Sequence, residues 1–230
     1  MLIIGDARLP VEAIKNLSAF GTFVPFATCG ITYEAVSGHP DLFFCQQQQQ
    51  VVVAPNMPEQ YMKILQNHGL SFVKGKLPVG KLYPQTSRYN AVVTSNFLIH
   101  NAKHTDPLLK ETFVKKEFIH VNQGYTRCNL LVLNDDLFIT SDNGIFRQLK
   151  KQHLDVYYFS PDDILLPGFE HGFLGGCLGV YENLVFVTGS LSRFQEGKKL
   201  CKLLESRHYK IVELYDGPLF DGGSLFFFTT

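Results

Sequence analysis

The sequence contains no tryptophan, only 3 methionines among 230 residues, and no excess of charge of either sign. Its 21 Lys and Arg residues balance 21 Asp and Glu residues. This balance argues against nucleic-acid binding through bulk positive charge, which needs basic residues to displace counterions. No window of apolar residues is long enough for a transmembrane helix. The N-terminal stretch MLIIGDARLP lacks the basic segment typical of a signal peptide, so we expect a cytoplasmic protein.

The cysteines show neither a disulfide pattern nor a metal-binding pattern. There are 5 of them, spread from position 29 to position 201, without a CxxC pair or a Cys/His spacing typical of metal sites. We therefore expect reduced thiols and neither a metal ion nor another cofactor. The charged fraction of 18% and the hydrophobic fraction of 45% are typical of a folded core rather than of disorder. The chain is long enough to bury a sizeable core, and we expect one domain over residues 1–230.

Short apolar runs that end in a turn or polar residue recur along the whole chain. They end at positions 56, 101, 142, 189 and 230, so the interval ranges from 41 residues (101 to 142) to 47 residues (142 to 189). Within each interval the order is the same: a helix-like stretch, a short apolar strand and a two-strand hairpin. The helix-like stretches begin near Pro10, Pro58, the Asp106–Pro107 pair, Asp142 and Ser192, where Ser192 and Gln195 form a capping box.

Two of the predicted hairpins have recognisable turns. The glutamine run 46–50 lies where the first hairpin turns, and the Asn-Asp-Asp segment 134–136 has turn chemistry in the third. The fifth unit ends in a single strand, SLFFF, and we expect its hairpin partner to be the first strand of the chain, residues 2–4. This pairing would close a ring of five units and remove exposed sheet edges. The sequence thus predicts an α/β propeller with five blades and pseudo-fivefold symmetry.

A helix, a strand and a hairpin repeated five times resemble the pentein fold. Amidinotransferases, arginine and agmatine deiminases and dimethylarginine hydrolases have this fold, and so does a ribosome anti-association factor that is not an enzyme. The strings SGHPD (37–41), RYN (88–90), QGYTRC (123–128), ITSD (139–142), GFEHGFLGG (168–176) and LFDGGS (219–224) resemble those of an uncharacterised bacterial family with the same fold. The resemblance implies the fold and leaves the activity open.

Polar or small residues precede the first hairpin strand of every repeat, where the blades of such a ring converge. They are Asp41, Asn90, Cys128, Gly176 and Ser224. One interpretation is that such residues line an axial pocket for a charged small molecule. The other is that they only satisfy backbone groups at strand ends. We expect Asp41, Asn90, Cys128, Ser224 and the nearby His171 to surround one axial cavity.

The enzymes that the repeat resembles use a cysteine of the fifth blade, a histidine of the fourth, and carboxylates that hold the guanidinium group. Here the fifth blade reads LFDGGSLFFFTT, with three phenylalanines at 226–228, and no cysteine follows Cys201. His171 lies where the fourth-blade histidine is expected, but the usual carboxylate two residues later is replaced by Phe173. His171 is equally compatible with a hydrogen bond to a loop carbonyl. The lack of a cysteine in the fifth blade argues against covalent cysteine catalysis of the usual kind.

Two hypotheses follow. The first is a protein that binds a small polar molecule in an axial pocket without catalysis. The alternative is a guanidino-group-modifying enzyme in which Cys128 or Ser224 acts with His171. Both hypotheses share the same candidate ligand-binding residues, namely Asp41, Asn90, Gln123, Arg127, Glu170 and Asp221. An arginine suits a carboxylate or a phosphate of the ligand, and carboxylates suit a guanidinium group. Arg127 is also compatible with a solvated charge at the rim, and Cys128 with a buried, inert thiol.

Overall fold

The computed structural model of the chain describes residues 1–134 and 136–229. Its strands form five sheets of three strands each, all with the same topology. In each sheet the first strand is antiparallel to the second, and the second is parallel to the third. The predicted turn at 134–136 and the predicted end of the last run at 230 lie partly outside the described residues.

Each sheet belongs to one repeat of the sequence. The five sheets comprise β3 (Phe44–Gln47), β4 (Gln50–Val53) and β5 (Val73–Lys74); β6 (Val92–Val93), β7 (Phe97–His100) and β8 (Glu117–His120); β9 (Leu130–Leu133), β10 (Leu137–Thr140) and β11 (Asp155–Tyr158); β12 (Leu178–Tyr181), β13 (Leu184–Val187) and β14 (Lys210–Glu213); and β15 (Phe226–Phe228), β1 (Leu2–Asp6) and β2 (Thr22–Phe26).

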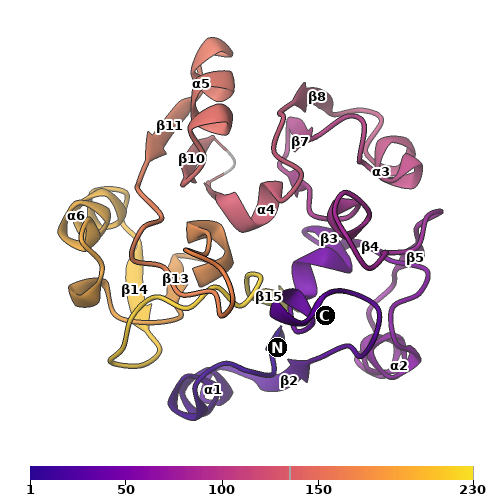
Figure 1. Ribbon diagram of the computed structural model, residues 1–230, viewed down its shortest axis with the longest axis horizontal. Coiled ribbons are helices and arrows are strands. Elements are labelled where there is room, and N and C mark those ends of the chain that lie inside the picture. Colours follow the sequence, from indigo (N-terminus) through magenta and orange to yellow (C-terminus); the bar gives the residue numbers. More distant parts are fainter. Residues whose placement is uncertain (135, 230) are drawn as a thin grey trace.

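The second and third strands of each sheet are connected by a helix, which is the crossover that parallel neighbours require. These helices are α1 (Val11–Ser18), α2 (Glu59–Asn67), α3 (Pro107–Thr112), α5 (Asn143–Lys151) and α6 (Gly197–Ser206). They are amphipathic, as α5 illustrates, since it buries Ile145 and Leu149 and exposes a basic face. Figure 1 shows five such units around one centre, with the helices outermost.

The predicted helix starts are confirmed for the repeats that begin with an aspartate. Asp106 accepts a hydrogen bond from the backbone N–H of Leu108 at the start of α3, and Asp142 accepts one from Ile145 at the start of α5. The predicted capping box at Ser192 is wrong. Residues 191–193 form a separate turn capped by Ser190, and the buried, extended Phe194 interrupts the chain before α6 begins at Gly197.

The two ends of the chain share one sheet, as the sequence predicts. Leu2 pairs with Phe228, Ile3 with Phe227 and Ile4 with Phe226, in antiparallel register. All of these side chains are buried, so the last strand completes the core of the fifth unit. The hairpin turn of β3 and β4 falls on the glutamine run, where Gln48 has a φ of 53°.

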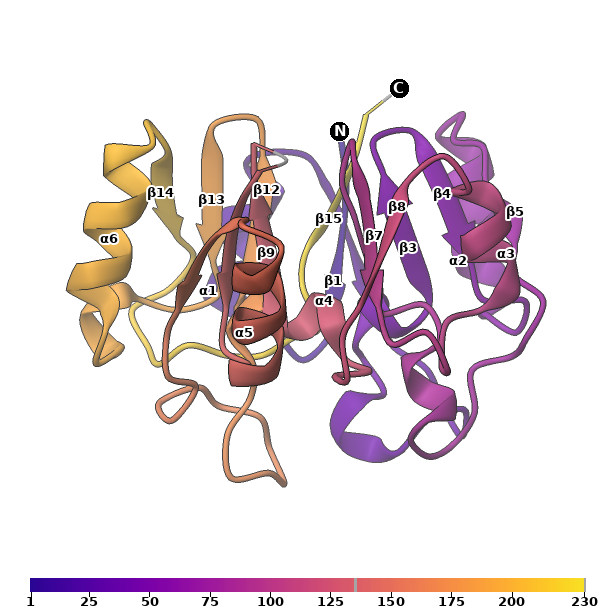
Figure 2. The same ribbon diagram turned by 90° about the horizontal axis from the view of Figure 1, so that it is seen from above.

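The molecule has two unlike edges. Figure 2 shows the hairpin turns and both termini at one edge, and the longer connecting loops at the other. The segments that connect the strands contain the short helices η1 (Glu34–Val36), η2 (Pro40–Leu42), η3 (Gln85–Ser87), α4 (Thr126–Asn129), η4 (Leu174–Cys177) and η5 (Leu191–Arg193). No helix in the described part of the chain is both long enough and apolar enough to cross a membrane.

Candidate functional site

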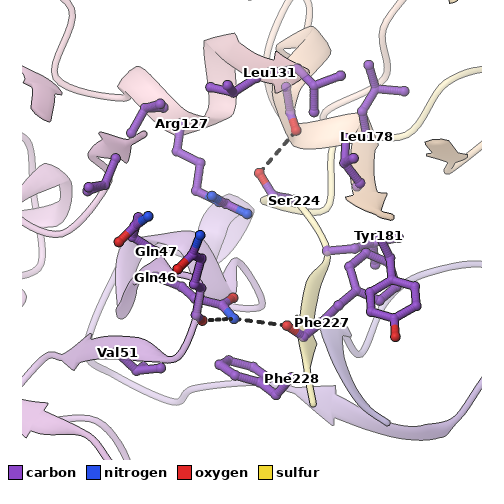
Figure 3. A pocket seen from close by; sticks show the side chains of 18 of the residues that line it. Gln46, Gln47, Val51, Arg127, Leu131, Leu178, Tyr181, Ser224, Phe227 and Phe228 are labelled. Carbon is purple, nitrogen blue, oxygen red and sulfur yellow. Dashed lines mark hydrogen bonds between the residues drawn. The ribbon is translucent and has the colours of Figure 1, made fainter. Parts of the chain in front are cut away.

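The first strands of the five sheets surround a large axial cavity, which we call the funnel. Its volume is about 1130 Å³. Hairpin-turn residues such as Gln48 and Glu182 line one end of the funnel. Arg127, Gly175 and Ser224, which precede the first strands of their sheets, line the other end, which we call the inner end. The walls between are largely apolar, with Val92, Leu131, Leu178, Phe227 and Phe228 among them. Figure 3 shows Arg127, Leu131, Leu178, Ser224, Phe227 and Phe228 around the cavity.

Arg127 brings a cationic group to the inner end of the funnel. Its guanidinium carbon lies 4.2 Å from the centre of the Phe226 ring, and its Nε is buried without a hydrogen-bond partner. Within the described residues, no carboxylate oxygen lies within 4.0 Å of the guanidinium nitrogens. Burial lowers the pKa of Arg127, while the negative charge of Asp41 opposes that shift. The funnel therefore ends at a cation that has no ion-pair partner among the described residues.

A closely packed polar cluster lies directly behind this inner end. Cys128 Sγ donates to Asp41 Oδ2 over 2.9 Å, and Ser224 Oγ donates to the same oxygen over 3.2 Å. Asn90 connects the segment of Asp41 to the segment of Arg127 and Cys128. Its Nδ2 donates to the carbonyl oxygen of Asp41 over 3.2 Å, and its Oδ1 accepts from the backbone N–H groups of Arg127 and Cys128. All four side chains are buried. The structure thus brings together four residues that the repeat alignment placed at equivalent positions.

His39 joins the cluster from the same segment as Asp41. Its Nε2 lies 4.0 Å from Asp6 Oδ2 and its Nδ1 lies 4.0 Å from Asp221 Oδ1. Asp6 in turn forms an ion pair with Arg8, two residues further along the chain. Asp221 is held by the backbone N–H groups of Gly223 and Phe173. Three carboxylates, one imidazole and one thiol therefore share a single buried region.

Close backbone approaches make room for these side chains. A Cβ at Gly176 would lie 1.8 Å from Asp221 Oδ1, and a Cβ at Gly223 would lie 2.4 Å from the Cβ of His39. Gly223 also has a φ of +68°, which favours glycine. The glycines of the GFLGG and DGGS strings therefore allow buried polar groups to pack closely.

Burial dominates the electrostatics of the cluster. It raises the pKa of the Cys128 thiol well above its ordinary value, and the charges of Asp41 and Asp221 raise it further. Burial also raises the pKa of Asp221 to about 6, although His39 opposes this shift. A thiol in these surroundings stays protonated at neutral pH, and a protonated thiol is a poor nucleophile.

The remaining predicted residues lie outside the cluster. Glu170 is exposed, and His171 is half-buried with its Nδ1 2.9 Å from the carbonyl oxygen of Gly172. Within the described residues, neither side chain forms a hydrogen bond or an ion pair with the cluster. The contact of His171 with a loop carbonyl is the second of the two interpretations that the sequence left open. Gln123 donates to Asp142 Oδ2 and accepts from the backbone N–H of Tyr125, so its amide holds α4 and α5 in place.

The predicted axial cavity needs one further correction. Of the five residues expected to surround it, only Ser224 lines the funnel; Asp41, Asn90 and Cys128 pack behind its inner end. Cys128 lies in the short helix α4 and Asp41 in the short helix η2, ahead of the strands whose side chains line the funnel. The sequence analysis did not place Asp6 or His39 among the candidate site residues. The signal for His39 was the SGHPD string, in which His39 and Asp41 flank one proline.

Comparison with protein families identifies the group to which this sequence belongs. A family of unknown function, DUF6873, matches residues 4–226. The chain belongs to this family. A search of curated proteins finds no match. The family assignment agrees with the resemblance that the sequence strings suggested, and because the function of the family is unknown, it assigns no activity to the chain.

Solved structures of several enzymes have a fold similar to that of this chain. Agmatine deiminase from C. jejuni is 11% identical, with a TM-score of 0.58 over 93% of this chain and 74% of that one. DDAH from Pseudomonas aeruginosa, complexed with citrulline, is 5% identical, with a TM-score of 0.53 over 92% of this chain and 91% of that one. Inosamine-phosphate amidinotransferase from Streptomyces griseus is 11% identical, with a TM-score of 0.54 over 97% and 92%. These similarities confirm the predicted pentein fold of α/β class.

Proposed function

We propose that this protein binds a small polar molecule with an anionic group in the funnel and does not act on it through a cysteine. The observation that carries the proposal is the guanidinium of Arg127, which ends a cavity of about 1130 Å³ without an ion-pair partner among the described residues. An arginine in this position suits a carboxylate or a phosphate, which it binds through two parallel hydrogen bonds. The apolar walls would cover the body of the same ligand.

The buried cluster supports the non-catalytic part of the proposal. The last strand has Phe226, Phe227 and Phe228 where the resemblance leads one to expect the nucleophile, and all three are buried. Cys128 is held as a thiol that donates to Asp41. Ser224 Oγ lies 3.2 Å from Asp41 Oδ2 and 3.0 Å from the carbonyl oxygen of Gly175, so its single proton is shared between two acceptors. Asp41 Oδ2 already accepts the proton of the Cys128 thiol, which makes this carboxylate a poor base for activating the serine hydroxyl.

The alternative function is modification of a guanidino group. It is favoured by the similarity of the fold to agmatine deiminase and to amidinotransferases, and by two buried carboxylates, Asp41 and Asp221, near the axis. Carboxylates hold a planar guanidinium by paired hydrogen bonds. The distance of His171 from the cluster weakens this alternative, because the proposed proton carrier would have to move to reach Cys128 or Ser224.

A binding experiment tests the main proposal. The protein is screened by thermal shift with small carboxylates, phosphorylated small molecules and guanidino compounds, and ligands that shift the melting temperature are titrated by calorimetry. A ligand at 100 times its Kd stabilises the native state by about 2.7 kcal/mol. Arg127→Gln should weaken the binding of an anionic ligand about 10- to 100-fold, which corresponds to one charged hydrogen-bonded pair.

Arg193→Gln is the matched control, because Arg193 is an exposed arginine that pairs with Asp216 on the surface. It should leave the affinity unchanged. Equal binding by wild type and Arg127→Gln would refute the anion site in the funnel.

A turnover assay separates the alternative. Wild type and Cys128→Ser are incubated with arginine, agmatine and methylated arginines, while ammonia, citrulline and released amines are measured. The binding proposal expects no turnover by either protein. Turnover that Cys128→Ser abolishes, together with a thiol adduct in the mass spectrum, would favour the enzyme.

A further inference from the structure

The buried cluster combines three kinds of metal ligand at one point. Nitrogen of His39, oxygen of Asp41 and sulfur of Cys128 all lie within 4.8 Å of one another, and all three residues are buried. We propose that His39, Asp41 and Cys128 bind a divalent transition-metal ion, for which Zn²⁺ is the preferred candidate. Imidazole nitrogen together with a thiolate and a carboxylate is a donor set typical of Zn²⁺ and unsuited to Mg²⁺ or Ca²⁺. This inference is independent of any ligand in the funnel.

Unpartnered polar atoms point into the same region. Both ring nitrogens of His39 and the Oδ1 atom of Asp41 are buried, and none of the three has a hydrogen-bond partner in the described part of the chain. His39 is only 1% exposed and Asp41 is fully buried, so water at the surface does not satisfy them. Leaving such groups unpaired in the interior costs free energy, and a metal ion would satisfy an imidazole nitrogen and a carboxylate oxygen at once.

The distances among the three ligand atoms are close to those expected around a bound Zn²⁺ ion. Zn²⁺ binds nitrogen and oxygen at about 2.0–2.2 Å and sulfur at about 2.3 Å, which places tetrahedral ligand atoms about 3.4–3.6 Å apart. Cys128 Sγ and Asp41 Oδ2 are now 2.9 Å apart because the thiol proton lies between them. Loss of that proton would let the two atoms separate around an ion, and the imidazole needs to approach by roughly 1 Å.

An outer partner is in place, and a further carboxylate is close by. Asp221 Oδ1 accepts from the backbone N–H of Gly223 and lies 4.0 Å from His39 Nδ1, so it would have to move closer to fill the remaining tetrahedral position. On the opposite side of the ring, His39 Nε2 lies 4.0 Å from Asp6 Oδ2. A metal-bound histidine usually donates its second N–H to such a carboxylate, which fixes the orientation of the ring. Asn90 Nδ2 donates a hydrogen bond to Cys128 Sγ over 3.3 Å, which orients the sulfur.

The proton balance of the step is simple. The ion displaces the proton of the Cys128 thiol, so one proton leaves to solvent as the sulfur–metal bond forms, while His39 binds through its neutral ring. Asp41 and the new thiolate supply two negative charges to match the ion. His39 and Asp41 come from the segment around η2, and Cys128 comes from α4; these segments precede β3 and β9, the first strands of two different sheets. The ion would thus connect two blades at the point where they converge.

Metal content is the first test. The protein is purified without a histidine tag, stripped with a chelator under denaturing conditions, and refolded with and without Zn²⁺, since the cluster is closed to solvent. We expect about one Zn²⁺ per chain by mass spectrometry after removal of free ion, and release of about one proton per ion bound. A content near zero after refolding would overturn the proposal and leave His39 as a histidine between two carboxylates.

Variants and cobalt identify the ligands. Co²⁺ bound to Cys128 should give a thiolate-to-metal charge-transfer band that Cys128→Ser abolishes. Cys177→Ser is the matched control, because Cys177 is also buried but donates to the carbonyl of Phe173. His39→Ala should weaken metal binding at least about 100-fold.

Circular dichroism checks that each variant folds. If Cys128→Ser does not fold, the cobalt spectrum of the wild-type chain still reports whether a thiolate is bound. Metal binding that is unchanged in folded His39→Ala, or a wild-type cobalt spectrum without the charge-transfer band, would refute the site.

Discussion

Acid titration of the chain should expose a buried neutral histidine. His100 is fully buried, with Nδ1 2.8 Å from Thr105 Oγ1 and Nε2 2.8 Å from the carbonyl oxygen of Gly124. Burial lowers the pKa of His100 from 6.5 to about 4, and the hydrogen bond to Gly124 only partly opposes this shift. The neutral ring therefore belongs to the native state, and the unfolded chain takes up a proton first as the pH falls.

The size of the effect follows from the two pKa values. Because the pKa in the native state is lower than in the unfolded state, the stabilising contribution of His100 is fully present above about pH 6.5. It is lost progressively as the pH falls from there through about 4. Between pH 7 and pH 4.5 this single group should lower the free energy of unfolding by about 2.5 kcal/mol. Asp221, whose pKa is raised to about 6, changes stability in the opposite direction over part of the same range.

Comparison with His100→Gln isolates the effect. Glutamine does not titrate, so the difference between the two proteins removes the contribution of Asp221 and of other acids. Urea unfolding at several pH values is followed by far-ultraviolet circular dichroism, since the chain has no tryptophan. His100→Gln should be less stable than wild type at pH 7, and the gap should shrink by about 2.5 kcal/mol by pH 4.5. Parallel stability curves for the two proteins would refute a buried neutral His100.

Two further predictions test the packing of the cluster. Gly223→Ala should lower the free energy of unfolding by about 3 kcal/mol or more, because the new Cβ would lie 2.4 Å from His39 and the backbone has a positive φ. Gly168→Ala is the matched control, since Gly168 has a φ of +89° but no atom within 4 Å of a Cβ, and it should lower this free energy by about 1 kcal/mol. Denaturant unfolding measures both, and equal losses would contradict the close approach. Iodoacetamide at pH 8 should alkylate the exposed Cys29 long before Cys128, as peptide mass spectrometry would show, and rapid labelling of native Cys128 would contradict its raised pKa.

The sequence by itself determined the architecture of this protein. Recurrent apolar runs at intervals of 41 to 47 residues, with helix signals between them, were enough to predict five units and the pairing of the two ends. Such features are local or periodic: Asp106 and Asp142 cap helices within three residues of themselves, and strand pairing follows from apolar patterning. The same periodicity placed Asp41, Asn90, Cys128 and Ser224 at equivalent positions, which the hydrogen bonds join.

Only the tertiary structure decided which ionisable groups meet and whether they face a cavity. His39 and Asp221 lie far apart in sequence, and nothing in the strings around them indicates that one approaches the other to 4.0 Å. The backbone of the short helix α4 decided that Cys128 packs behind the funnel while its neighbour Arg127 enters it. Burial, which shifts the pKa of a thiol or a carboxylate, depends on how all five blades converge, and so it follows from the assembled ring rather than from any one repeat.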